Sequence, residues 1–308
     1  MTVAVTGAGG FVGRHLVERL SEAGHRVRGL YHRRAAGSAE GVQAVWGGLE
    51  DSAALDRLID GSDAVVHLAG LVAADRQARF HAVNAAGTAQ LAQRAAAHGV
   101  DRFLFVSSLA ARHPGLSPYA ASKRGGECAL ARQDGLPADI LRPPAVYGAG
   151  DPQILTFIRL IRRGLAPLPG PPEARVCVVH VDDLVAAITA WLAGPGPTGT
   201  TYEISDDRPD GYSWRELMAT AAAACNARPV YLRLGRSALM PVAAVGEGIA
   251  RLTGRPATLS RGKVRELCHP DWRCDPTPFH RATGWRPRVG ASAGLKHTVA
   301  WYHAQGWL

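Results

Sequence analysis

The chain has 308 residues, of which 47% are hydrophobic and 20% charged, a balance typical of a globular protein with one large core. No apolar stretch is long enough to span a bilayer, and the first residues form neither a basic region nor a signal-peptide cleavage site. We therefore expect a cytoplasmic protein without a membrane partner.

The net charge is +9, from 35 Lys and Arg against 26 Asp and Glu. A basic protein attracts phosphates, including those of nucleic acids. The arginines are spread along the chain, however, and no repeat of aromatic and basic residues indicates a platform for nucleic-acid strands. The charge thus favours an anionic cofactor or substrate, and we expect no nucleic-acid partner.

The five cysteines are an odd number and are scattered, which indicates reduced thiols rather than a disulfide framework. Cys268, His269, Cys274 and His280 are close in sequence. They lack the short C-x-x-C spacing of structural zinc sites. We expect no metal site.

Strands and helices alternate through the first half of the chain. Apolar segments predict strands at residues 3–5, 25–34, 42–51, 63–70 and 102–108. Helical patterns lie between them, at 14–24, 52–61 and 84–98, and a further helix follows the last strand. This alternation predicts an α/β fold, a Rossmann-type doubly wound parallel sheet with helices on both faces.

The alternation ends after Gly150, where an amphipathic helix at 154–164 leads into a Pro-rich run. A strand and helix at 175–192 and a strand at 201–206 are expected to return to the sheet. We therefore assign residues 1–149, with 176–205 returning, to a Rossmann domain. Residues 150–308 are assigned mainly to a smaller, interleaved C-terminal substrate lobe.

A glycine-rich turn, TGAGGFVG, connects the first strand to the first helix and contains Gly7, Gly10 and Gly13. Glycine is needed where the backbone turns tightly and where it approaches a pyrophosphate closely. The N-terminus of the following helix offers free N–H groups to phosphates. The turn therefore predicts a dinucleotide site, with a plain tight turn as the alternative.

The end of the second strand bears on the choice of dinucleotide. A site for NAD usually has an acidic residue there for the ribose 2′-hydroxyl. That position falls near Tyr31, and the neighbours are His32, Arg33 and Arg34. The basic cluster favours the 2′-phosphate of NADP, with NAD and a solvated basic loop as the alternatives.

Tyr119 and Lys123 are four residues apart in a segment that begins with Ser117 and Pro118, a typical helix start. This spacing places both side chains on one face of a helix, one turn apart. A phenol has an ordinary pKa of about 10, and a neighbouring ammonium stabilises its ionised form. The pair is a candidate for proton transfer.

Six motifs in this order resemble those of the extended short-chain dehydrogenase/reductases, the NAD(P)-dependent epimerase/dehydratase group. They are TGAGGFVG, HLAG (67–70), NAAGT (84–88), YAASK (119–123), RPPAVYG (142–148) and VHVDDL (179–184). The resemblance covers roughly the first 200 residues.

The resemblance implies that Tyr119 transfers the proton with Lys123 as its partner, and that Ser108, rather than Ser107, binds the substrate oxygen. It also implies cofactor contacts beyond the three turn glycines and the basic cluster, at Phe11, Val12, Leu49, Leu68, Ala69, Gly70, Tyr119, Lys123, Pro143, Ala145 and Val146. One departure is Gly48, which replaces the Asp that meets the adenine amino group in many relatives. We expect adenine to be held by backbone groups alone.

These features favour an NADP(H)-dependent oxidoreductase, a carbonyl reductase or alcohol dehydrogenase, acting on a small-molecule carbonyl or alcohol. Two alternatives stay open: an NAD-dependent nucleotide-sugar epimerase, and a nucleotide-sensing protein without catalysis. The resemblance also suggests a homodimer formed through helices next to the sheet.

Overall fold

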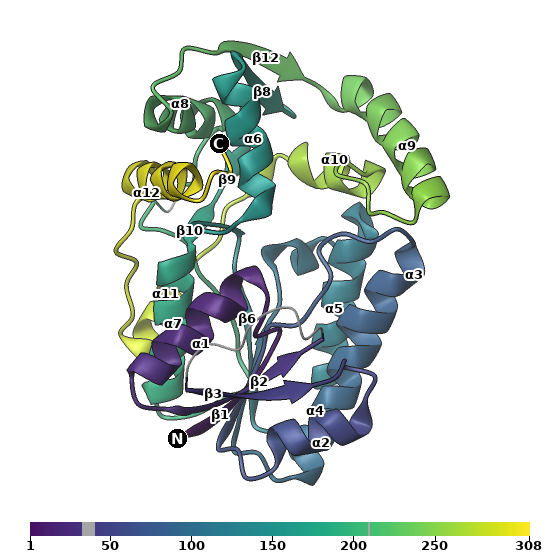
Figure 1. Cartoon of the computed structure of the whole chain (residues 1–308), viewed down its shortest axis with the longest axis vertical. Coiled ribbons are helices and arrows are strands. Elements are labelled where there is room, and N and C mark those ends of the chain that lie inside the picture. Colours follow the sequence, from purple (N-terminus) through teal and green to yellow (C-terminus); the bar gives the residue numbers. More distant parts are fainter. Residues whose placement is uncertain (33–40, 209) are drawn as a thin grey trace. The chain divides into compact units, whose positions relative to one another are not determined.

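The structure is a computed structural model that describes residues 1–32, 41–208 and 210–308 (Figure 1). Arg33 and Arg34 lie outside the described residues, so of the predicted basic cluster only His32 is placed. In the described ranges, no helix has both the length and the apolar character needed to cross a membrane.

The chain divides into two compact units. The first contains Met1–Arg142 and Ala187–Tyr202, and the second contains Pro143–Ala186 and Glu203–Leu308. The first unit therefore ends earlier than the domain 1–149 expected from the sequence. Of the returning segment 176–205, only its later part belongs to this unit.

The first unit is built on a seven-stranded sheet with the order β11-β6-β5-β4-β1-β2-β3 (Figure 1). Its strands are β1 (Thr2–Thr6), β2 (Arg26–Tyr31), β3 (Val42–Trp46), β4 (Ala64–His67), β5 (Arg102–Val106), β6 (Ala138–Arg142) and β11 (Thr201–Glu203). All pairings from β6 to β3 are parallel. The strand order reverses between β1 and β4, so the predicted doubly wound α/β sheet is confirmed.

Helices follow β1, β3, β4 and β5, as the sequence predicts. They are α1 (Phe11–Glu22), α2 (Ser52–Ile59), α3 (Gln77–Phe80), a π-helical turn η1 (His81–Ala86), α4 (Gly87–Ala97), two short 3₁₀ turns η2 (Leu109–Arg112) and η3 (Pro114–Leu116), and α5 (Pro118–Leu130). α1 buries Leu16, Val17 and Leu20, the residues at helical spacing. The core beneath α2 and α4 contains Leu55, Leu58, Ile59, Leu91, Ala95, Val65, Phe103 and Phe105.

The second unit has short parallel strand pairs, β10 with β7, β12 with β8 and β13 with β9. Its strands are β7 (Ala145–Tyr147), β8 (Leu165–Pro169), β9 (Arg175–Val176), β10 (Val178–His180), β12 (Val230–Leu234) and β13 (Asp271–Trp272). Its helices are α6 (Pro152–Arg162), α8 (Trp214–Ala224), α9 (Arg236–Thr253), α10 (Arg261–Leu267), α11 (Thr277–Thr283) and α12 (Ala291–Ala304). α7 (Val181–Ala193) begins in this unit and ends in the first.

The strand expected within 175–192 does not return to the central sheet. Its two parts, β9 and β10, pair with β13 and β7 instead. Pro143 and Pro144 follow β6 directly, and because proline lacks an N–H, the chain leaves the sheet ladder at that point. The strand expected at 201–206 does join the sheet, as β11.

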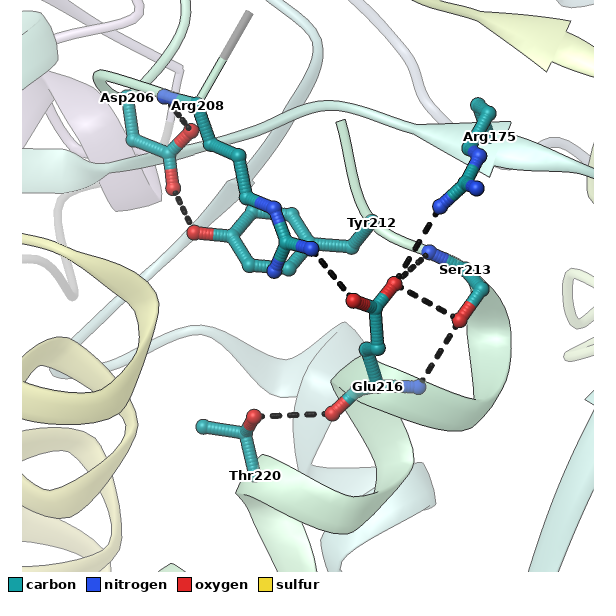
Figure 2. A network of polar contacts seen from close by, with 7 residues as sticks. All are labelled: Arg175, Asp206, Arg208, Tyr212, Ser213, Glu216 and Thr220. Atoms are coloured by element: carbon teal, nitrogen blue, oxygen red, sulfur yellow. Dashed lines mark hydrogen bonds and ion pairs between the residues drawn. The ribbon is translucent and has the colours of Figure 1, made fainter. Parts of the chain in front are cut away.

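A network of hydrogen bonds and ion pairs stabilises the N-terminus of α8 (Figure 2). The Glu216 carboxylate accepts hydrogen bonds from the Ser213 amide at 2.7 Å and the Ser213 hydroxyl at 2.8 Å, and it pairs with Arg208. These hydrogen bonds from Ser213 lower the pKa of Glu216 to about 2. The Tyr212 hydroxyl donates to Asp206 at 2.6 Å. The start of α8 is therefore held by these side-chain contacts together with the backbone pairing of Tyr212 with Val176.

Candidate active site

The glycine-rich turn has the shape that a pyrophosphate requires. Gly7 has a φ of +71°, and a Cβ at this position would lie 2.8 Å from the Ala69 amide nitrogen. A Cβ on Gly13 would overlap the Gly7 carbonyl. The turn therefore packs directly against the end of β4, and only glycine fits there.

The first helix begins at this turn with its N–H groups uncapped. Gly10 is the N-cap of α1 and supplies no side-chain hydrogen bond, so the amides of the first turn, including those of Phe11 and Val12, stay available to a ligand. Leu68, Ala69 and Gly70 follow β4 beside it, and the Ala69 amide donates to the Thr6 hydroxyl at 3.2 Å. A dinucleotide phosphate fits this cradle.

At the adenosine end of the predicted site, the structure describes Tyr31, His32 and Leu49. Tyr31 is buried at the end of β2, its ring 5.5 Å from that of Trp46, and His32 is exposed. Leu49 is buried and packs on Gly87, since a Cβ on Gly87 would lie 2.8 Å from Leu49. Neither described residue at the end of β2 carries a carboxylate.

Glu50 is a residue that the sequence analysis missed. Its carboxylate lies over Gly48, where it would overlap any Cβ at that position. An acidic group therefore occupies the place of the side chain that Gly48 lacks. The signal in the sequence is an acid two positions after the glycine, which a position-by-position comparison passes over.

A buried imidazole connects β1, β4 and α4. The Thr6 hydroxyl is 2.7 Å from His67 Nδ1, and the Thr88 hydroxyl is 2.9 Å from His67 Nε2. Thr88 donates its proton to the Asn84 carbonyl at 2.7 Å, so it accepts from Nε2, which fixes the Nε2–H tautomer of His67. Burial, with a smaller effect of Lys123, lowers the pKa of His67 to about 3. His67 is neutral in the folded protein.

Asn84 connects this network to α5. It is buried in η1, and its amide nitrogen donates to the Leu71 carbonyl and to the Ser122 hydroxyl, both at 2.9 Å. Its amide oxygen accepts from the Leu71 amide at 2.7 Å. Ser122 in turn donates to the Tyr119 carbonyl at 2.7 Å. The backbone at Tyr119 is thus connected to η1 through Ser122 and Asn84.

Tyr119 and Lys123 lie on α5, as the spacing predicts. The helix begins at Ser117, whose hydroxyl accepts from the Ala120 amide at 2.9 Å, and Pro118 occupies its first position. The Tyr119 ring is half-buried and meets Phe80 edge-on, with 6.2 Å between centroids.

Lys123 is buried, with 5% of the residue exposed. Its Nζ donates to the Val106 carbonyl at 2.9 Å and lies 4.6 Å from the centroid of the Phe105 ring. Burial lowers the pKa of Lys123 to about 8, and Glu127 opposes part of this shift. Lys123 is therefore charged at neutral pH, close to the point where it loses its proton.

The two serines at the end of β5 have different partners. Ser107 is buried and donates to Glu127 at 2.7 Å, and Glu127 is also bound by Arg142 through both carboxylate oxygens. Ser108 is half-buried, and its hydroxyl accepts from the Ala110 amide at 3.2 Å, which leaves the hydroxyl proton available for a ligand. The choice of Ser108 over Ser107 as the substrate-binding serine stays a prediction.

The structure brings most predicted site residues of the first unit to one edge of the sheet, because the carboxyl ends of parallel strands meet there. Pro143, Ala145 and Val146 belong to the second unit, where Ala145 and Val146 are part of β7. Their role in cofactor binding stays a prediction. Among the described residues, no group of three or more His, Cys, Asp or Glu could hold a metal ion.

A doubly wound sheet with this turn and a buried Lys one helical turn from a Tyr has the architecture of NAD(P)-dependent enzymes. Comparison with known proteins gives the same class. The sequence model of the NAD dependent epimerase/dehydratase family matches residues 3–205, and the chain belongs to this family. It is an NAD(P)-dependent enzyme of the extended short-chain dehydrogenase/reductase type, as its motifs indicate.

Two relatives match over nearly their full length. The chain is 41% identical to a ceramide reductase of Caulobacter vibrioides over 99% of this chain and 96% of the relative. It is 30% identical to a 2-alkyl-3-oxoalkanoate reductase of Stenotrophomonas maltophilia over 97% and 99%. These likenesses support a reductase of the extended type.

Solved structures agree on the fold. A dTDP-glucose 4,6-dehydratase from Streptomyces venezuelae with bound NAD superposes with a TM-score of 0.77 at 26% identity, over 100% of this chain and 98% of that one. A UDP-glucose 4-epimerase from Thermotoga maritima gives 0.78 at 23% identity, over 99% of both chains.

Proposed function

We propose that this protein is an NADP(H)-dependent reductase that converts the ketone of a long-chain 3-oxo lipid to a secondary alcohol. The observation that carries the proposal is the α5 pair, Tyr119 with the buried ammonium of Lys123, held by the His67–Asn84 network. The substrate class follows from two of the relatives that match over nearly their full length, which are named for ceramide and for 2-alkyl-3-oxoalkanoates.

Ser108, Tyr119 and Lys123 have different roles in the proposed carbonyl reduction. When bound, the nicotinamide ring supplies the hydride that reaches the carbonyl carbon. The Ser108 hydroxyl donates a hydrogen bond to the carbonyl oxygen and orients it. Tyr119 gives that oxygen its proton as the alcohol forms, and Lys123 stabilises the resulting phenolate, which regains a proton from solvent.

The choice of NADP(H) rests on the adenosine end of the site. Tyr31 and His32 offer no carboxylate to a ribose 2′-hydroxyl, and the sequence continues with two arginines that suit a 2′-phosphate. We assign the adenine amino group to the Glu50 carboxylate, which lies over Gly48. The uncapped start of α1 holds the pyrophosphate.

The main competing function is an NAD-dependent nucleotide-sugar epimerase. The likeness to a solved dehydratase with bound NAD favours NAD as the cofactor. Against this function stand the higher identity to two reductases and the lack of an acid at the end of β2 among the described residues. A protein that only binds a nucleotide does not require Ser108, Tyr119 and Lys123 together, since this combination serves proton transfer.

The test begins with the protein as purified. Any nucleotide it carries is released and identified, and the emptied protein is then mixed with NADPH or NADH and a long-chain 3-oxoacyl compound. We expect NADPH to be consumed together with the ketone, and NADH to be consumed more slowly. Retained NAD, with conversion of UDP-glucose and none of the ketone, would overturn the proposal in favour of the epimerase.

A further inference from the structure

Helix α9 presents an apolar face that no part of the described chain covers. Val242, Val245, Ile249 and Leu252 are 60%, 65%, 56% and 89% exposed. Their spacing of three, four and three residues places them within an arc of roughly 80° on the helix. Single exposed apolar residues are common, but a continuous row over three turns of one helix is not.

The opposite face of α9 is already in use. It buries Ala243 and Ala250 and packs against α10. Glu247 accepts hydrogen bonds from the Arg261 amide and from the Arg261 guanidinium, both at 2.8 Å. The helix is therefore fixed to its unit by its inner side, and the exposed row is its outer side.

The outer face also lacks the charges of an ordinary solvated helix. Between Arg236 and Arg251 the one charged residue of α9 is Glu247, which is bound to Arg261 on the inner side. The strand β12 leads directly into α9 and exposes Val230 and Leu232, which alternate and so share one strand face. Apolar surface thus continues beyond the helix.

Positive charge surrounds this apolar face. Residues 228–260 contain five arginines and a single acidic residue. The arginines are all exposed and stand near the two ends of α9, at Arg228, Arg233, Arg236, Arg251 and Arg255. An amphipathic helix with an apolar face and flanking arginines is suited to lie in the interface of an anionic membrane.

We propose that α9 docks this protein onto the surface of an anionic lipid bilayer, with Val242, Val245, Ile249 and Leu252 inserted among the lipids and the arginines on the headgroups. The expectation of no membrane partner considered only a segment that spans the bilayer, and a helix that lies on the surface needs no such length. The proposal is independent of the reductase assignment, because its test measures binding and not turnover.

The experiment is cosedimentation of the full chain with vesicles of phosphatidylcholine alone or of phosphatidylcholine and phosphatidylglycerol in equal parts. We expect binding to the anionic vesicles that weakens as salt is raised, and at least about tenfold less binding to the neutral ones. The variant Val245→Glu/Ile249→Glu should lose at least about tenfold of the binding to anionic vesicles.

The matched control is Ala219→Glu/Ala223→Glu, which adds the same two charges at the same spacing to the exposed face of α8. It should bind vesicles nearly as wild type does. Circular dichroism and light scattering on each variant establish its folding and oligomeric state. The proposal would be overturned if the wild-type protein did not bind anionic vesicles. It would also be overturned if both variants lost vesicle binding to the same extent. A dimer that Val245→Glu/Ile249→Glu dissociates, without vesicle binding, would show that a second copy covers this face.

Discussion

The two ends of the candidate cofactor site are built very differently. At the nicotinamide end, His67, Asn84, Ser122 and Lys123 each have buried hydrogen-bond partners that connect β4, η1 and α5. At the adenosine end, His32 is exposed, and the exposed Glu50 reaches over Gly48. The residues predicted to take part in chemistry are thus held by buried hydrogen bonds, whereas the described residues predicted to select the cofactor, His32 and Glu50, are exposed.

The largest effect is expected from Lys123→Met, which removes the buried ammonium one helical turn from Tyr119. Turnover should fall about 10²- to 10⁴-fold. Because the wild-type pKa is about 8, wild-type activity should also decline as pH rises through that value. The measurement is a pH profile of kcat. Wild-type activity that stays flat well above pH 8 would contradict a role for the charged amine.

The same variant should be more stable than wild type at neutral pH. In the unfolded chain Lys123 keeps its ordinary pKa of 10.5, so unfolded protein binds more protons than folded protein between pH 8 and that value. The free energy of unfolding of the wild type therefore increases as pH rises from about 8 to 10.5. The free energy of unfolding of Lys123→Met, measured with urea, should therefore exceed that of wild type by less as pH rises. The Val106 carbonyl, which loses its hydrogen-bond donor in the variant, reduces this difference at every pH.

Ser108→Ala and Ser107→Ala separate a chemical role from a structural one. Ser108→Ala should lower kcat about 100-fold with little change in stability. Ser107→Ala takes a partner from the buried Glu127 and should cost about 1–3 kcal/mol of stability. Turnover and urea unfolding on both variants decide the matter. An equal loss of turnover in both variants would contradict a chemical role for Ser108 and a structural role for Ser107.

The buried His67 predicts acid sensitivity of the nicotinamide end. Its folded pKa of about 3 lies below the ordinary 6.5, so the unfolded chain binds the extra proton first as pH falls. The stability that His67 contributes is full above pH 6.5 and is lost as pH falls toward 3. A His67→Gln variant should show a flatter pH dependence of urea unfolding in this window. An equally steep dependence would assign the acid sensitivity to other groups.

The smallest effect is expected at the adenosine end. Glu50→Gln keeps the shape of the side chain and removes its charge, and should weaken NADPH binding about tenfold. Glu22→Gln, an exposed acid at the end of α1, is the matched control and should bind normally. Fluorescence titration measures both. Unchanged affinity in Glu50→Gln would mean that adenine is held by backbone groups alone, as the sequence suggests.

The sequence carried enough information for the sheet, the glycine turn and the Tyr119–Lys123 pair, because each depends on local spacing. It predicted a regular helix at 84–98, where the structure has the π-helical turn η1 before α4. That turn is held by contacts of Asn84 with Leu71 and Ser122, which come from distant segments. Similarly, nothing in the local sequence shows that β9 and β10 pair outside the central sheet.

The measurement that tests the account most directly is turnover and NADPH binding of Tyr119→Phe. This substitution removes only the phenolic oxygen from a ring that packs against Phe80. We predict a fall in turnover of about 10²- to 10⁴-fold, with NADPH affinity and thermal stability near those of wild type. Turnover close to wild type, with the cofactor bound normally, would contradict the assignment of Tyr119 as the proton donor and with it the proposed active site.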